Sequence, residues 1–97
     1  MPATVFSVSS NAVSAGQQLT ASTLCLKTTG MVAGNRIGVE ASDNATLANY
    51  APCEIEVNGT RHWIVNNGVV ALPLPSGWFV RIVSEDCTGA NIRVVLE

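Results

Sequence analysis

Apolar and polar residues alternate in short runs along the whole chain, and Gly, Asn, Pro and Ser separate these runs. Because successive side chains of a strand point to opposite faces, each alternating run predicts a β-strand with one buried face. Seven or eight short antiparallel strands in 97 residues predict an all-β fold, a compact single-domain β-sandwich of jelly-roll, Greek-key or Ig-like type spanning residues 1–97. The predicted strands are Thr4–Val8, Ser22–Thr28, Arg36–Ala41, Cys53–Val57, Arg61–Val65, Val69–Leu72, Trp78–Ser84 and Ala90–Leu96.

The last third of the chain indicates which side chains face the core. Residues 78–84 are mostly apolar on both sides, which predicts a central strand that is covered on both faces. In the strand that follows, Ile92, Val94 and Leu96 lie on one side. We therefore expect these three side chains to point into the core.

Two turn signals organise the middle of the chain. Asn58-Gly59 predicts a two-residue type I′ turn, because both positions tolerate positive φ, and Asn67-Gly68 predicts the turn after it. Together the turns place four apolar residues and one cross-strand ion pair on the same sheet face. A face that is apolar at one end and polar at the other is typical of a subunit interface. The candidate interface residues are Trp63, Val65, Val70, Leu72, Glu56 and Arg61.

The segment 7–18 is small, polar and uncharged, unlike the rest of the chain. One interpretation is a surface loop that contains a weak strand. The other is an extended N-terminal arm within residues 1–20 that pairs with the sheet edge of a neighbouring subunit, since main-chain pairing needs no particular side chains. The sequence alone leaves both interpretations open.

Charged residues make up 12% of the chain, against about a quarter in an ordinary soluble domain. So little charge predicts that part of the surface is covered, either by other copies of the chain or by a partner protein. The five basic residues stand singly, and nucleic-acid binding needs a basic stripe that displaces counterions. We therefore expect no nucleic-acid partner and no membrane partner.

The N-terminus lacks the pattern of a secretory signal, because the first basic residue is Lys27. The longest apolar run, Val69–Leu74, is also too short for a transmembrane helix. We expect a protein without a signal peptide that is made in the host cytoplasm.

The three cysteines, Cys25, Cys53 and Cys87, are an odd number at wide spacings, which predicts buried or half-buried free thiols rather than a disulfide framework. A metal site would have to combine them with His62. No Cys-x-x-Cys pair is present, and structural zinc sites usually use such pairs, so we expect a core-facing histidine and no metal.

The sequence contains few of the residue patterns that catalysis needs. There is one histidine and no Gly-x-Ser-x-Gly motif for an activated nucleophile. Glu54 and Glu56 could form a carboxylate pair, but Arg61 is a simpler partner for Glu56. We therefore predict that the protein is not an enzyme and has no catalytic residues and no cofactor. The aromatic side chains that could instead stack on a sugar ring are Trp63, Trp78, Phe79 and Tyr50.

In general character the chain resembles the small virion proteins of tailed bacteriophages, such as head decoration or cement proteins. The likeness lies in a short, leaderless β chain rich in Ala, Val, Ser, Thr, Asn and Gly, with the late segments Gly77–Val83 and Gly89–Val95. The resemblance implies a non-enzymatic structural protein on the capsid exterior that forms a homo-oligomer, a dimer or trimer. It further implies binding to the major capsid protein or another virion protein, which stabilises the head.

Two alternatives to this assignment stay open. One is a carbohydrate- or receptor-binding β-sandwich module, in which Trp63 would serve as a stacking platform. The other is a small connector or tail component of the phage particle.

Overall fold

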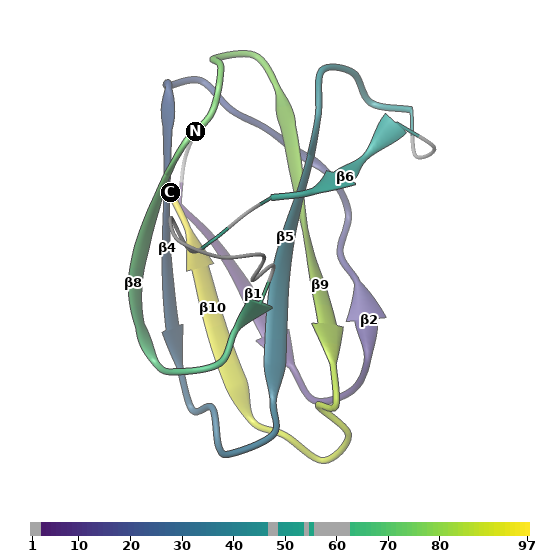
Figure 1. Ribbon diagram of the computed structural model, residues 1–97, viewed down its shortest axis with the longest axis vertical. Coiled ribbons are helices and arrows are strands. Elements are labelled where there is room, and N and C mark those ends of the chain that lie inside the picture. The colour runs from purple at the N-terminus through teal and green to yellow at the C-terminus, as the bar shows by residue number, and fades with distance from the viewer. Residues whose placement is uncertain (1–2, 47–48, 54, 56–62) are drawn as a thin grey trace.

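Two antiparallel sheets pack face to face in the computed structural model, which describes residues 3–46, 49–53, 55 and 63–97 (Figure 1). Sheet A has the strand order β1-β10-β4-β8, with β1 Thr4–Val8, β10 Ile92–Leu96, β4 Thr23–Thr29 and β8 Gly68–Pro73. Sheet B has the order β2-β9-β5-β6, with β2 Ala12–Val13, β9 Phe79–Glu85, β5 Arg36–Ser42 and β6 Ala51–Pro52. Two short strands extend sheet B, β3 Gln17–Gln18 beside β9 and β7 Trp63–Ile64 beside β5. The predicted all-β sandwich is therefore confirmed.

The predicted strands fall close to the observed ones. The strand at Thr4–Val8 has the predicted bounds, and β4, β5, β8, β9 and β10 begin and end within two residues of them. For the segment 7–18, where β2 and β3 lie, the sequence indicated at most one weak strand, and it did not predict β6, because these two-residue strands pair at strand edges through the backbone and show no alternation. The described residues therefore form ten strands rather than seven or eight. Of the predicted strand Cys53–Val57, the described residues Cys53 and Ile55 lie in no strand, and the rest of it lies outside the described residues, as does the predicted Asn58-Gly59 turn.

The core lies between the sheets and follows the alternation of the sequence. Every second residue of β4 is buried, and β9 and β10 repeat the pattern. Ile92, Val94 and Leu96 all point inward, as predicted. Strand β9 lies between β5 on one side and β2 and β3 on the other, which confirms its central position, but its outward-facing side chains are half-buried rather than covered as predicted.

The predicted pairing around the Asn67-Gly68 turn is wrong. β7 pairs with β5 in sheet B, whereas β8 pairs with β4 in sheet A. The chain therefore crosses from one sheet to the other between β7 and β8 instead of forming a hairpin. As a result Leu72 lies in the core and Val70 packs against it, so neither shares a face with Trp63.

The N-terminal segment, for which two interpretations were open, pairs within the chain over its described part. β1 forms an edge of sheet A, and β2 and β3 then run along β9 in sheet B. Figure 1 shows β2 beside β9 at the edge of the sandwich. The segment thus links the two sheets along one side.

One buried polar group in the core lowers the stability of the folded state by a measurable amount. The Thr28 hydroxyl is fully buried, and no hydrogen-bond partner for it is found among the described residues. Since an unpaired buried hydroxyl destabilises the folded state, we expect Thr28→Val to raise the free energy of unfolding by about 1 kcal/mol. Urea denaturation measures this change. Thr29→Val, at the neighbouring exposed position, is the matched control, and a loss of stability in Thr28→Val would contradict the assignment.

Candidate interface on the outer face of sheet B

A short sequence motif occurs twice and builds the outer face of sheet B. Both Arg36–Glu40 and Arg81–Glu85 read Arg-Ile-x-x-Glu. The first motif lies in β5 and the second in β9, and the two strands are antiparallel neighbours. Because the period of a strand is two, the arginine, the central residue and the glutamate of each motif point outward, while the isoleucine points into the core.

The strand register turns the repeated motif into two reciprocal ion pairs. Arg36 lies opposite Glu85, and Glu40 lies opposite Arg81. The Arg36 Nη2 to Glu85 Oε2 distance is 2.7 Å, and the Arg81 Nε to Glu40 Oε1 distance is 2.6 Å. The second pair is the more buried, with side-chain exposures of 16% for Arg81 and 22% for Glu40, against 36% and 47% in the first pair.

Each arginine also stacks on an aromatic ring. The Arg36 guanidinium lies 4.9 Å from the centre of the Trp63 ring, and the Arg81 guanidinium lies 4.3 Å from the centre of the Tyr50 ring. Both distances are within the range of a cation–π interaction. The outer face therefore has an approximate twofold pattern, with one arginine, one glutamate and one aromatic ring in each half.

A row of apolar residues crosses the sheet between the two ion pairs. The strand register aligns Trp63, Gly38, Val83 and Val13 on four neighbouring strands. A hollow of about 110 Å³ lies between Trp63, Val83 and Pro52, and Gly38, which is itself buried, lines it. At the end of the row Val13 is 56% exposed. The centre of the face is thus apolar and indented, and it is bordered by paired charges.

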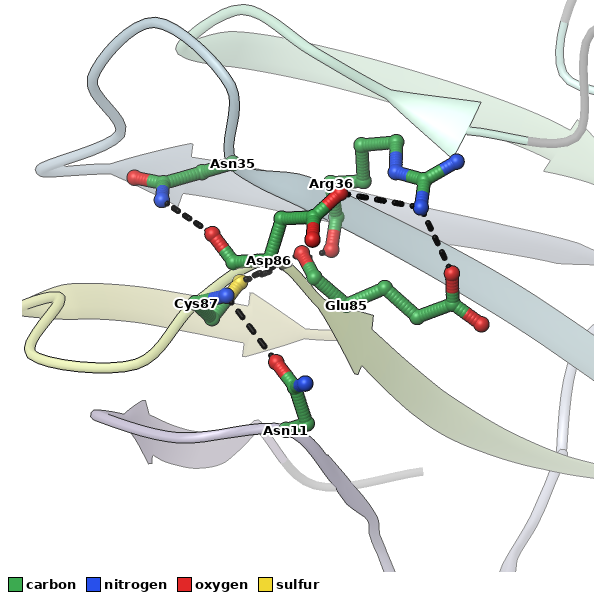
Figure 2. Close-up of polar contacts among 6 residues, drawn as sticks. All are labelled: Asn11, Asn35, Arg36, Glu85, Asp86 and Cys87. Carbon is green, nitrogen blue, oxygen red and sulfur yellow. Dashed lines mark hydrogen bonds and ion pairs between the residues drawn. The ribbon is translucent and has the colours of Figure 1, made fainter.

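Polar contacts at one end of the sandwich hold the first ion pair in place (Figure 2). The Asn35 side-chain amide donates to the Asp86 carbonyl, and the Cys87 backbone N–H donates to the Asn11 side-chain oxygen. Asp86 has φ 53°, a left-handed conformation that aspartate tolerates better than most residues. Its carboxylate lies 3.0 Å from Arg36 Nη2, so the loop after β9 supplies a second acid to this arginine.

Of the four candidate interface residues that the structure describes, only Trp63 contributes to this face. Val65 follows β7 and is exposed, outside the apolar row. Val70 and Leu72 belong to sheet A and pack in or against the core. Glu56 and Arg61 lie outside the described residues. The motif Arg-Ile-x-x-Glu was the sequence signal for this face. Its two copies indicate a shared face only once β5 and β9 are known to pair.

The three cysteines are free thiols, as predicted, but their burial differs from the prediction. Cys87 is buried and Cys53 is half-buried, whereas Cys25 is exposed because it alternates with the core residues Leu24 and Leu26. Burial, and then the negative charge of Glu40, raise the pKa of the Cys53 thiol. Cys53 therefore stays protonated near neutral pH and is a poor nucleophile or metal ligand.

Within the described part of the chain, no three His, Cys, Asp or Glu side chains are grouped as a metal site would need. His62, which a site with Cys53 would require, lies outside the described residues.

Of the aromatic residues considered for sugar stacking, Trp63 and Tyr50 each carry an arginine against the ring. Trp78 packs against the core.

Comparison with protein families, curated proteins and solved structures finds no match for this chain. The residues that the structure describes contain no helix with the length and apolar character needed to cross a membrane.

Proposed function

We propose that this protein is a non-enzymatic structural protein of a virion, a capsid decoration protein that associates with itself and stabilises the phage head. The observation that carries the proposal is the outer face of sheet B, where an apolar row is bordered by charges that are already paired within the chain. Interface cores are poor in unpaired charge and rich in aromatic and arginine side chains. Trp63, Arg36 and Arg81 provide these groups here.

The outer face of sheet A supports a second contact, with the capsid. The register aligns Val5, Val95, Lys27 and Val69 in a row across its four strands. Val5 is 50% exposed and Val69 is 70% exposed. A decoration protein needs one surface for its own copies and another for the shell, and the two outer faces of this sandwich fit that division. The major capsid protein, or another virion protein, would bind to sheet A.

Light scattering across a dilution series tests the self-association. We expect an oligomer that dissociates on dilution, and we expect Trp63→Ala to remain folded but to dissociate at a concentration about tenfold higher, because a buried aromatic anchor is lost. Val69→Ala, on the other sheet, is the control and should behave as the unaltered protein does. Circular dichroism checks that both variants are folded.

Two results would argue against this function. A monomer at every concentration would remove self-association. Quenching of Trp63 fluorescence by added sugars, with no response to dilution, would instead favour the carbohydrate-binding module. The decoration role itself requires that the protein stay bound to the phage particles whose genome encodes it when these particles are purified on a density gradient.

A further inference from the structure

We propose that a second copy of this chain docks face to face on the outer face of sheet B, about a twofold axis that runs between β5 and β9 and parallel to them. The inference rests on the self-association proposed above and specifies its surface, its partner and its orientation. It follows from two properties of the face, the order of its charges and the shape of its apolar row.

The two cross-strand ion pairs form a four-cornered pattern of alternating sign, with Asp86 as a further negative charge beside Arg36. Along β5 the positive Arg36 precedes the negative Glu40, and along the antiparallel β9 the negative Glu85 lies opposite Arg36 and the positive Arg81 opposite Glu40. Rotation by 180° about an axis parallel to the strands places β5 of the partner copy over β9. Residues that are opposite each other in the strand register then stay at the same level along the axis. Each positive corner then lies over a negative corner of the partner, so the pattern is complementary to itself, as a twofold interface requires.

The apolar row fits the same rotation. It places the Val83 side chain of one copy over the hollow at Gly38 of the other, and it places Trp63 over the partner's Val13. A large side chain thus meets a small one at each position. A twofold axis across the strands would also match the charges, but it would place Trp63 on the partner's Trp63 and leave the two hollows facing each other. Shape therefore selects the axis that runs along the strands.

The Arg36–Glu85 pair has the reach and exposure that this packing needs, whereas Arg81 and Glu40 keep only 16% and 22% of their side-chain surface exposed. Face-to-face sheets lie about 10 Å apart, a gap that arginine and glutamate span. Arg36 and Glu85 keep 36% and 47% of their side-chain surface exposed within one copy. Their outer atoms are therefore available to hydrogen-bond across the interface while each intrachain pair is retained.

Exchanging the two residues of one ion pair with each other tests the proposed surface and the proposed axis together. In the double variant Glu40→Arg with Arg81→Glu, the two residues can still pair within the chain, but β5 then carries two positive charges and β9 two negative ones. Two copies of the variant remain complementary about the proposed axis. A variant copy facing an unaltered copy brings like charges together at two of the four corners.

We expect the double variant to form a dimer with itself, and mixed dimers with the unaltered protein to be depleted about tenfold below the statistical fraction. Native mass spectrometry of the variant mixed with ¹⁵N-labelled unaltered protein measures this fraction. Labelled and unlabelled copies of the unaltered protein provide the statistical control. Thermal unfolding confirms that the variant is folded despite the loss of the arginine stacked on Tyr50.

The alternative results separate the possible failures. Statistical mixing would show that this face is not the interface, although self-association itself would stand. A folded variant that is monomeric would indicate an axis across the strands and would overturn the proposed orientation. An unaltered protein that never dimerises would overturn both this inference and the proposed function.

A second variant tests the surface without altering its charge pairs. Val13→Arg introduces an unpaired charge at the exposed end of the apolar row, where the proposed dimer places the partner's Trp63. We expect its dimer dissociation constant to rise about tenfold or more. Val5→Arg is the matched control, since Val5 is similarly exposed on the opposite sheet. Equal effects of the two variants would overturn the assignment.

Discussion

Replacing Ile82 by alanine is expected to lower the free energy of unfolding by about 2–5 kcal/mol, the range for truncating a buried isoleucine. Ile82 is 3% exposed and lies at the centre of β9, opposite Val39 of β5. Its backbone is held independently of the side chain, since its N–H donates to the Ser14 hydroxyl and its carbonyl accepts from the Ser14 N–H. The substitution therefore removes packing from the core and leaves the strand pairing in place.

Chemical denaturation followed by tryptophan fluorescence measures the loss. Val5→Ala is a suitable control, because Val5 is a half-exposed strand residue on an outer face, and its truncation should change the stability by no more than about 0.5 kcal/mol. If Ile82→Ala cost as little as the control, β9 would not be a central strand with an inward-facing isoleucine.

Replacing Gly30 by alanine is expected to cost about 2–5 kcal/mol, from backbone strain and steric overlap together. Gly30 follows β4 with φ +85°, a conformation that residues with a Cβ atom adopt only at a cost. A Cβ atom here would also overlap the backbone carbonyl oxygen of Asn91, just before β10. The absence of a side chain at this position thus lets the loop after β4 pack directly against the loop between β9 and β10.

Gly34→Ala separates the two contributions. Gly34 lies in the same loop with a similar φ of +93°, but no atom approaches the position of its Cβ within 4 Å. Its replacement should therefore cost only the strain, about 1–2 kcal/mol. The difference between the two variants in urea denaturation measures the overlap with Asn91. Equal losses would mean that the two loops do not meet as described.

The side-chain alternation within each strand was visible in the sequence. Leu24 and Leu26 in β4, and Val94 and Leu96 in β10, face the core at the positions that a period of two predicts. This information is local, because the direction of a side chain depends only on its place in its own strand. The turn signals were less informative. Asn67-Gly68 leads into β8, which begins at Gly68 and pairs with β4 rather than with β7, so that Leu72 is buried opposite Leu24.

For the candidate interface, too, the residues were visible in the sequence but their arrangement was not. The two copies of Arg-Ile-x-x-Glu, Trp63 and the scarcity of charge could all be found in the sequence. Their arrangement could not, since Arg36 and Glu85, and Glu40 and Arg81, are brought together only by the pairing of two strands more than forty residues apart. Without that register, Gly38 has no Val83 opposite it and the hollow beside Trp63 has no boundary.

The sequence by itself therefore determined the all-β class, the long strands and their buried sides, because these follow from neighbours along the chain. Only the tertiary structure decided which strands pair, in which sheet and in which register. Long-range pairing depends on how apolar faces from distant segments fit around one core, and short-range patterns do not specify that fit. The alternating charges and the apolar row of sheet B are a product of this register.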